Sequence, residues 1–200
     1  MSEPHYEIWL FRHGETEWSA SGQHTGRTDL PLTEAGRERA EAVGRRVAGR
    51  PFALVLSSPL VRALDTCRLA GYGGSAELAD DLREWDYGDY EGRRTLDIQK
   101  ERPGWSLWTD GVPNGETAED VGRRAGRVID RAAAAGGDVA LFAHGHILRV
   151  LTACWLGLPP TGGQLFALGT AAVSVLGFEH DDHVIRRWNQ SSDLVEVEEA

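Results

Sequence analysis

Short runs of consecutive apolar residues punctuate the chain, and polar residues follow each of them. The clearest three are Ile8–Phe11, Ala53–Leu56 and Val139–Ala143. Runs of this length, rich in branched and aromatic side chains, are typical of strands buried on both faces of a sheet. Two further strands are expected over Ala171–Phe178 and Val184–Trp188, joined as a hairpin around residues 180–183.

Apolar residues at helical spacing occupy the segments between these runs. Helices are expected from Thr33, as N-cap, to Pro51, from Pro59 onward, over Leu96–Arg102, from Glu116 to about Ala135, and from His146 through Leu156. Pro59 is placed in the first turn of its helix, where its missing N–H is tolerated. This alternation of strands and helices predicts a parallel sheet covered by helices on both faces.

Length and punctuation predict a single domain over residues 1–192, since domains commonly run about 100 to 200 residues. Residues 83–92 contain too many Gly and Asp residues for a regular helix, so an ordered loop is expected there. The Trp-bearing residues 93–114 are expected to form a flap over a pocket. The acidic residues 193–200 are expected to be a mobile tail.

Charge and composition exclude several classes of partner. A formal net charge of −10 argues against general nucleic-acid binding, which needs a basic face. No apolar stretch reaches the ~20 residues needed to cross a bilayer, and the first residues lack the features of a signal peptide. Cys67 and Cys154 are too few for a disulfide framework, which fits a reducing compartment. A cytoplasmic protein without membrane or nucleic-acid partners is expected, and a homodimer remains among the open oligomeric states.

Two of the predicted strands end in histidines. Arg12-His13-Gly14 follows the first strand, and His144-Gly145-His146 follows the strand that ends at Ala143. Neighbouring parallel strands would bring both turns to one edge of the sheet, where ligands bind in α/β folds. Arg62, early in its helix, would approach the same edge. Two histidines and two arginines together suit a phosphoryl group, whose oxygens need several fixed donors.

The same residues suggest a division of chemical work. A neutral His13 can attack phosphorus and form phosphohistidine, and nearby arginines would lower its pKa and favour that form. A leaving alkoxide needs a proton, and Glu84, crowded by aromatic residues, is the preferred general acid. Glu91 and Asp86 are local alternatives, and Glu84 could also be a solvated loop carboxylate.

An ordered series of motifs makes the chain resemble a known family. The motifs are R-H-G-E, T-G, P-L-T, S-S-P-x-x-R-A, E-x-x-Y-G-x-x-E-G, N-G-E-T and A-H-G-H, found between Ile8 and Arg149. Together they resemble the histidine phosphatase superfamily, in its phosphoglycerate mutase-like branch. The resemblance implies a three-layer α/β/α sandwich with a mostly parallel central sheet, and no metal or other cofactor. It also implies roles for particular residues: His13 as phosphorylated nucleophile, Glu84 as proton donor and acceptor, and Arg12, Arg62 and His144 as phosphate ligands.

The resemblance also places Thr25 and Gly26 on the substrate side of the pocket, where Gly145 would offer its backbone N–H. The other expected substrate-binding residues are Ser19, Gln23, Tyr87 and His146. More polar and basic residues lie near the motifs than one phosphate requires. This number favours small metabolites as substrates, namely phosphorylated sugars or sugar acids that carry a second anionic group. The candidates for that second anion also include His24, Arg93, Arg94, Lys100 and Arg149.

Departures from the family pattern favour hydrolysis over mutase chemistry. Mutases of this family typically carry Asn at the position of Ser19, and a longer insertion before the N-G-E-T motif. A shorter lid leaves phosphohistidine open to water. The fuller strings are most similar to a subgroup that includes acid phosphatases and sedoheptulose-bisphosphatase-like enzymes. Three alternatives stay open: phosphoglycerate mutase-type transfer, a catalytically silent phosphate-binding module, and a metal site using His144 and His146.

Overall fold

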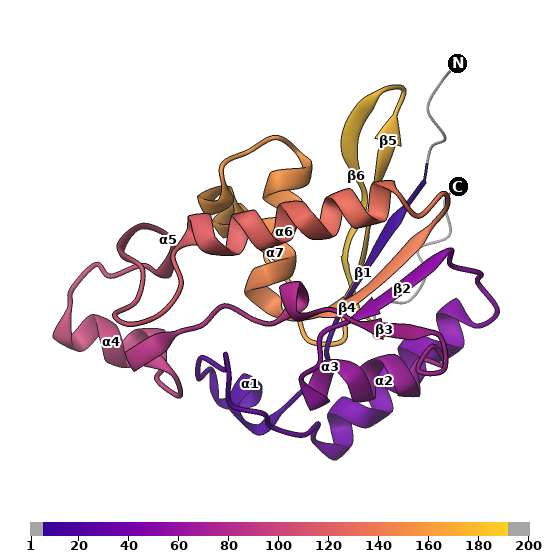
Figure 1. Cartoon of the computed structure of the whole chain (residues 1–200). Helices are drawn as coiled ribbons and strands as arrows, with labels where there is room; N and C mark the ends of the chain where they lie inside the picture. The colour runs from indigo at the N-terminus through magenta and orange to yellow at the C-terminus, as the bar shows by residue number, and fades with distance from the viewer. Residues whose placement is uncertain (1–5, 192–200) are drawn as a thin grey trace, which may run out of the picture.

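A computed structural model describes residues 6–191 of the chain, and the strands in this range form a six-stranded sheet (Figure 1). The strands are β1 Ile8–Arg12, β2 Leu54–Ser57, β3 Ala76–Leu78, β4 Val139–Ala143, β5 Val173–Glu179 and β6 Asp182–Gln190. Their order is β3-β2-β4-β1-β5-β6. The first four run parallel, whereas β5 is antiparallel to both β1 and β6. The predicted mostly parallel sheet and its terminal hairpin are confirmed.

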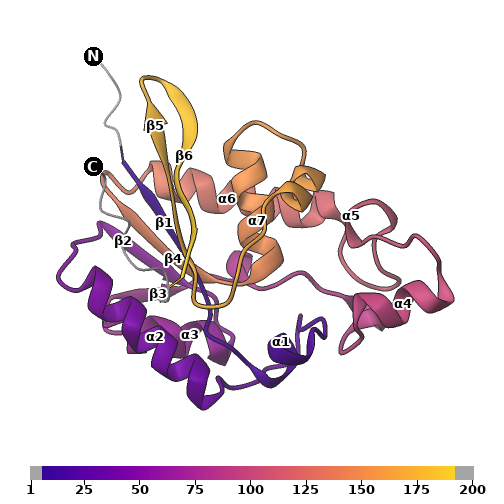
Figure 2. The ribbon, with the colours of Figure 1, turned by 180° about the vertical axis from the view of Figure 1, so that it is seen from behind.

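Helices cover both faces of this sheet and also gather at one end of it. They are α1 Glu17–Ser21, α2 Glu34–Val47, α3 Val61–Leu69, α4 Thr95–Glu101, α5 Leu107–Asp110, α6 Ala118–Ala133 and α7 Gly145–Trp155, with 3-10 turns η1 Asp80–Leu82, η2 Gly88–Tyr90 and η3 Pro160–Leu165. Seen from opposite sides, α2 and α3 lie on one face and α6 and α7 on the other (Figures 1 and 2). The three-layer α/β/α architecture is therefore confirmed.

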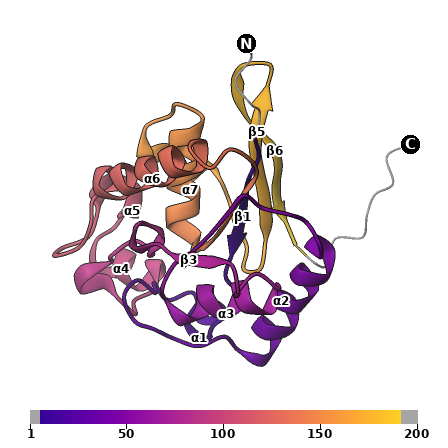
Figure 3. The same ribbon diagram turned by 45° about the vertical axis from the view of Figure 1, so that its right-hand side comes forward.

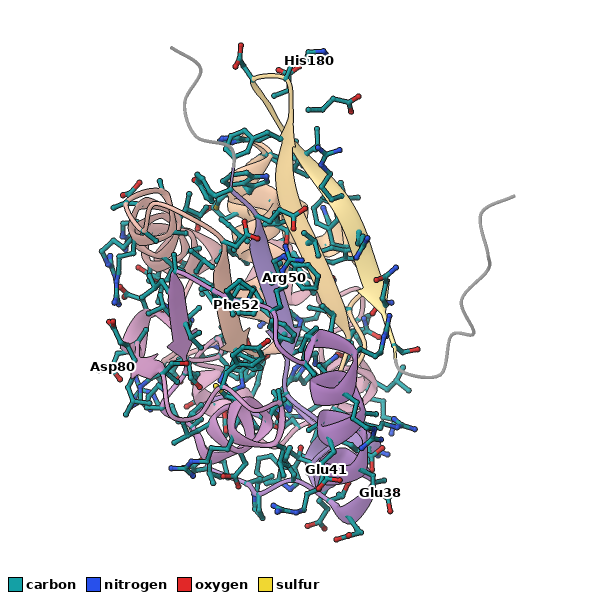
Figure 4. All side chains as sticks on the ribbon, turned by 90° about the vertical axis from the view of Figure 1, so that its right-hand side faces the viewer. Glu38, Glu41, Arg50, Phe52, Asp80 and His180 are labelled. Carbon is teal, nitrogen blue, oxygen red and sulfur yellow. The ribbon has the colours of Figure 1, made fainter. Side chains whose placement is uncertain are left out.

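Burial on both faces explains why the strands read as unbroken apolar runs. Leu10 packs in the core beneath α6 and α7, and its neighbour Phe11 packs in the core beneath α2 and α3. On that second face Phe11 stacks on Phe142 of β4, with ring centroids 4.4 Å apart. Arg50 and Phe52 also lie beside each other on this side of the sheet (Figure 4).

The carboxyl ends of the parallel strands point toward the end of the sheet where α1 and the start of α3 lie. Figure 3 shows β1 running toward α1 and α3, while the turn of the β5–β6 hairpin lies at the opposite end of the sheet. His180 marks that turn in Figure 4. No helix within residues 6–191 is long and apolar enough to cross a membrane.

The structure differs from the sequence-based expectations in the start of one helix and in two short elements, and one expected segment lies outside the described residues. Pro59 precedes its helix instead of standing in the first turn, because α3 begins at Val61, whose N–H is already accepted by Asp29 at 2.8 Å. The short β3 and α5 were not expected: each has only three or four residues, too few for a periodic pattern. The tail predicted over 193–200 lies outside the described residues.

The turn after β1 is held against the start of α2 by two glycines. A methyl group on Gly14 would lie 2.3 Å from the carbonyl oxygen of Gly36, and one on Gly36 would lie 2.2 Å from that of Glu15. Both obstacles are backbone atoms, so no side-chain rotation could relieve the contact. The position of the His13 turn therefore depends on α2.

Gly36→Ala is expected to destabilise the protein by about 1 to 3 kcal/mol or more, because the added methyl group overpacks against backbone. Gly126 supplies a matched control: it also lies within a helix, but the space around it is open. Gly126→Ala is expected to stabilise the protein by about 0.5 to 1 kcal/mol, since alanine loses less conformational entropy. Urea unfolding measures both changes. Similar midpoints for the two variants would contradict this account of the turn.

Candidate active site

The two histidine-bearing turns lie side by side at the carboxyl ends of β1 and β4. Arg12 pairs with Ala143 in the parallel register, so the residues that follow these two emerge together. The rings of His13 and His144 have centroids 5.1 Å apart. A cavity of about 200 Å³ opens beside them. Its wall includes these residues expected from the sequence: Arg12, His13, Ser19, Gln23, Thr25, Glu84, Tyr87, Gly145 and His146.

His13 is held in one tautomer by its neighbour. Its Nδ1 lies 2.6 Å from the carbonyl oxygen of Gly14. Because a carbonyl can only accept, Nδ1 carries the proton and Nε2 keeps its lone pair. Gly14 is fixed in turn, since its N–H donates to Thr66 Oγ1 at 3.0 Å. Burial first, and then Arg12 and Arg62, hold the pKa of His13 well below its ordinary value, so the ring is neutral.

Arg12 has hydrogen-bonding capacity left over. Its Nη1 donates to the carbonyl of Leu168, whereas its buried Nε has no hydrogen-bond partner among the described residues. A buried unpaired donor on a cation is costly unless an acceptor arrives. Since Arg12 lines the cavity, its free N–H suits an anion bound there.

Arg62 and His144 lie behind His13, outside the cavity wall. Arg62 Nε donates to His144 Nδ1 at 3.1 Å, and His144 Nε2 lies 2.8 Å from Ser58 Oγ. Both side chains are completely buried. Burial, together with Arg62 and His13, lowers the pKa of His144 well below its ordinary value. Direct contact of either residue with a ligand requires these hydrogen bonds to be exchanged.

The remaining donors of Arg62 tie down the loop before α2. They reach the carbonyl oxygens of Thr25 and Gly26 at 3.0 Å and that of Thr28 at 2.9 Å. Gly26 therefore sits beneath the cavity and does not line it, in contrast to the expectation. A side chain there would meet the carbonyl oxygen of Trp85 at 2.6 Å, which leaves no room for another residue.

Glu84 projects into the cavity from the ordered loop and contacts the start of α7. Its Oε1 accepts the N–H groups of Trp85 at 2.9 Å and Ile147 at 3.0 Å, and its Oε2 accepts that of His146 at 3.0 Å. The N–H groups at a helix start favour a negatively charged partner. The side chain is 6% exposed.

The two alternative carboxylates are used elsewhere. Glu91 accepts the N–H groups of Gly26 and Thr28, and Asp86 pairs with Arg27 at 2.6 Å. Neither lines the cavity. Of the three acidic residues considered, only Glu84 is therefore positioned to exchange a proton with a ligand.

Aromatic and imidazole groups form the wall farther from His13. Tyr87 Oη lies 2.6 Å from His146 Nδ1, and the ring of His24 packs 4.7 Å from that of Tyr87. Burial lowers the pKa of His24 to about 4 and that of His146 well below its ordinary value. Arg149, which stacks over Trp108 at 4.7 Å, is therefore the charged group of this wall.

Some basic residues from the sequence do not reach the site, and other residues were missed. Arg93 pairs with Glu101, whereas Arg94 and Lys100 share Asp97, and none of the three basic residues lines the cavity. Gly22 and Leu168 do line it, although no motif marks them. Leu168 is used through its carbonyl oxygen, which any residue could supply, so its identity carries no signal.

Across residues 6–191, no group of three or more His, Cys, Asp or Glu side chains is arranged to hold a metal ion. What the site combines is a neutral imidazole nitrogen, a cation with an unused donor, and a carboxylate across the cavity. The imidazole can attack the phosphorus of a phosphoryl group, the cation can hold its oxygens, and the carboxyl group can supply a proton.

Comparison with known proteins agrees with this arrangement. The chain is 40% identical to an acid phosphatase of Mycobacterium tuberculosis over 184 residues, covering 90% of each chain. It is 40% identical to the sedoheptulose 1,7-bisphosphatase of Saccharomyces cerevisiae over 182 residues, covering 74% of this chain and 67% of the relative. The solved structure of an open reading frame product from Mycobacterium tuberculosis superposes with a TM-score of 0.89 at 37% identity, covering 94% of this chain and 98% of that one.

The family model of the histidine phosphatase superfamily, branch 1, matches residues 8–191. That match spans the sheet, the two histidine-bearing turns and the Glu84 loop together. The chain therefore belongs to branch 1 of the histidine phosphatase superfamily.

Proposed function

We propose that this protein is a phosphatase of the histidine acid phosphatase type, which hydrolyses phosphate monoesters of small metabolites through phosphohistidine at His13. The observation that carries the proposal is the neutral His13, whose Nε2 keeps its lone pair beside an Arg12 guanidinium with an unused donor. A cavity of about 200 Å³ suits a small ligand, because pockets that bind drug-sized ligands have volumes of roughly 300 to 1,000 Å³.

The reaction follows from this geometry in two steps. His13 Nε2 attacks phosphorus while the bond to the leaving oxygen breaks, and Glu84 gives that oxygen its proton. Water then attacks phosphohistidine, and Glu84 takes the proton back. Arg12 holds the phosphoryl oxygens through its free donor. Arg62 and His144 serve as phosphate ligands once their mutual hydrogen bond is exchanged for the phosphate, and until then Arg62 helps to keep His13 neutral.

Hydrolysis, instead of return of the group to a sugar acid, is supported by the small size of the covering segment. Residues 93–114, the proposed flap, contain only α4 and α5, with seven and four residues. They approach the cavity through Trp108, whose ring lies 5.3 Å from that of His146. A short flap leaves water free to reach phosphohistidine.

The function is tested by measuring phosphate release from an aryl phosphate and from a panel of phosphorylated sugars and sugar acids. Release is expected with kcat/KM well above that of the His13→Ala variant. Interconversion of phosphoglycerates without release would identify a mutase instead. Binding of vanadate without turnover of any substrate would identify a silent phosphate-binding module.

Sugar phosphates with a second anionic group are the proposed preferred substrates, since Arg149 adds a second arginine, besides Arg12, to the cavity wall. One charge-assisted contact contributes on the order of 1.5 to 3 kcal/mol, so a sugar bisphosphate is expected to exceed its monophosphate by about tenfold or more in kcat/KM. Arg149→Ala is expected to remove this preference. Arg94→Ala is the control, because Arg94 is exposed and paired with Asp97. Equal rates for the two substrates in the wild type would contradict recognition of a second anion.

A further inference from the structure

A second buried arginine lies outside the cavity and has no part in the chemistry described so far. Arg124 of α6 is 9% exposed and forms a two-pronged ion pair with Glu116. Its Nε donates to Glu116 Oε1 at 2.8 Å and its Nη2 to Oε2 at 2.9 Å. The two residues are called the clamp below.

The rest of the Arg124 guanidinium faces the backbone that leads to Glu84. Nη1 donates to the carbonyl oxygens of Asp81 at 2.8 Å and Arg83 at 2.6 Å, and Nη2 to that of Glu84 at 3.2 Å. Three carbonyl groups from one short segment thus converge on one cation. Only a planar fork with five N–H donors can serve all of them and a carboxylate together.

Glu116 holds the same segment on the other side of Glu84. Its Oε2 accepts the N–H of Asp86, its own N–H donates to the Asp86 carbonyl, and its carbonyl accepts Trp85 Nε1, each at 2.9 Å. The clamp therefore grips the backbone both before and after the residue whose carboxylate reaches the cavity.

From these contacts we propose that Arg124 and Glu116 are positioning residues, which hold the Glu84 carboxylate against the start of α7 for proton transfer. Glu84 forms its hydrogen bonds with α7 through its two carboxylate oxygens. The placement of this carboxylate therefore depends on the position of the backbone of residues 81–86. Without these two side chains the segment would lose four hydrogen bonds. Three run from Arg124 to the carbonyl oxygens of Asp81, Arg83 and Glu84. The fourth runs from the N–H of Asp86 to the Glu116 carboxylate. The inference rests on the proposed function, in which Glu84 exchanges the proton.

The first measurement needs no turnover. The N–H groups of His146 and Ile147 donate to the Glu84 carboxylate, so their hydrogen exchange reports its placement. Arg124→Lys keeps the charge but loses the fork, and both amides are expected to exchange about tenfold faster or more, relative to Leu151 in the same helix. Arg123→Lys is the matched control, because Arg123 is exposed and pairs within its own helix.

The second measurement uses the leaving group. Arg124→Lys is expected to lower kcat/KM for an alkyl phosphate about tenfold more than for an aryl phosphate, whose leaving group needs little protonation. In a Glu84→Gln background the same change is expected to leave the alkyl-to-aryl ratio unaltered, because the positioned group is already gone. Glu116→Gln, which keeps the side-chain volume, is expected to give a smaller shift of the same kind.

The outcomes separate this inference from the proposed function. Faster amide exchange in Arg124→Lys, with a wild type that releases phosphate from neither substrate, would support the clamp and contradict the proposed function. Unchanged relative exchange at His146 and Ile147 would overturn the clamp, whatever the turnover. Faster exchange with an unaltered alkyl-to-aryl ratio would also overturn it, since a role in folding alone lowers both activities together.

Discussion

His13→Ala is expected to lose at least about a thousandfold in kcat/KM, a loss of roughly 4 kcal/mol in transition-state stabilisation. The variant removes the nitrogen that is proposed to attack phosphorus. His144, the nearest imidazole, has both ring nitrogens engaged, by Arg62 and by Ser58. Residual activity is expected to come only from the binding groups that remain.

Trapping the intermediate tests the same prediction directly. Acid quenching of the wild type with labelled substrate is expected to give a phosphoprotein that is labile in acid and stable in alkali, as phosphohistidine is. His180→Asn is a control, because His180 lies in the hairpin turn at the far end of the sheet (Figure 4) and its positive φ of 54° also suits asparagine. A label that survives in His13→Ala, or that lies on serine, would contradict the proposed mechanism.

Glu84→Gln is expected to have the second largest effect, and to discriminate between leaving groups. A general acid contributes typically 10²- to 10⁴-fold, so a loss of at least about a hundredfold is expected for an alkyl phosphate. For an aryl phosphate the loss is expected to be much smaller. The glutamine oxygen can still accept the N–H of Ile147, although the amide NH2 cannot accept that of His146 as the carboxylate does. Steady-state kinetics with both substrates measures the difference, and equal losses would assign the proton to another group or to water.

The pH dependence follows from the same two residues. Because the pKa of His13 lies well below 6.5, the nucleophile stays neutral as the pH falls through that value. The proposed mechanism needs the leaving group to receive a proton and the nucleophile to stay neutral, so alkyl phosphate hydrolysis is expected to be best in mildly acidic solution. The rise toward acidic pH is expected to disappear in Glu84→Gln. A rise that persists in the variant would show that another group titrates.

The sheet could be predicted because its central strands are buried on both faces, so Ile8–Phe11 and Val139–Ala143 each contain only apolar residues. The edge strand β3 could not, because two of its three residues are exposed and one of these is charged. The helix after β2 starts at Val61, later than Pro59 suggests, and Asp29 from a distant loop accepts the N–H of Val61. Long-range contacts of this kind leave no periodic pattern.

For the site, sequence order and strand ends sufficed to bring Arg12, His13 and His144 together, because parallel strands align their carboxyl ends. They did not show which side chains face the ligand. Arg62 is consumed by carbonyl oxygens and by His144, and Gly26 lies beneath the cavity. The basic residues near α4 are neutralised by their own neighbours, such as Asp97. Each of these facts depends on which partner lies nearest in space.

The place of β1 in the sheet has a consequence for the synthesis of the chain. Of the six strands of this sheet β1 is synthesised before the others, yet both of its neighbours, β4 and β5, belong to the last third of the sequence. At roughly 5 to 20 residues per second, its apolar side chains wait on the order of ten seconds for a partner strand. A nascent chain in this state offers an unpaired apolar segment to chaperones or to other chains.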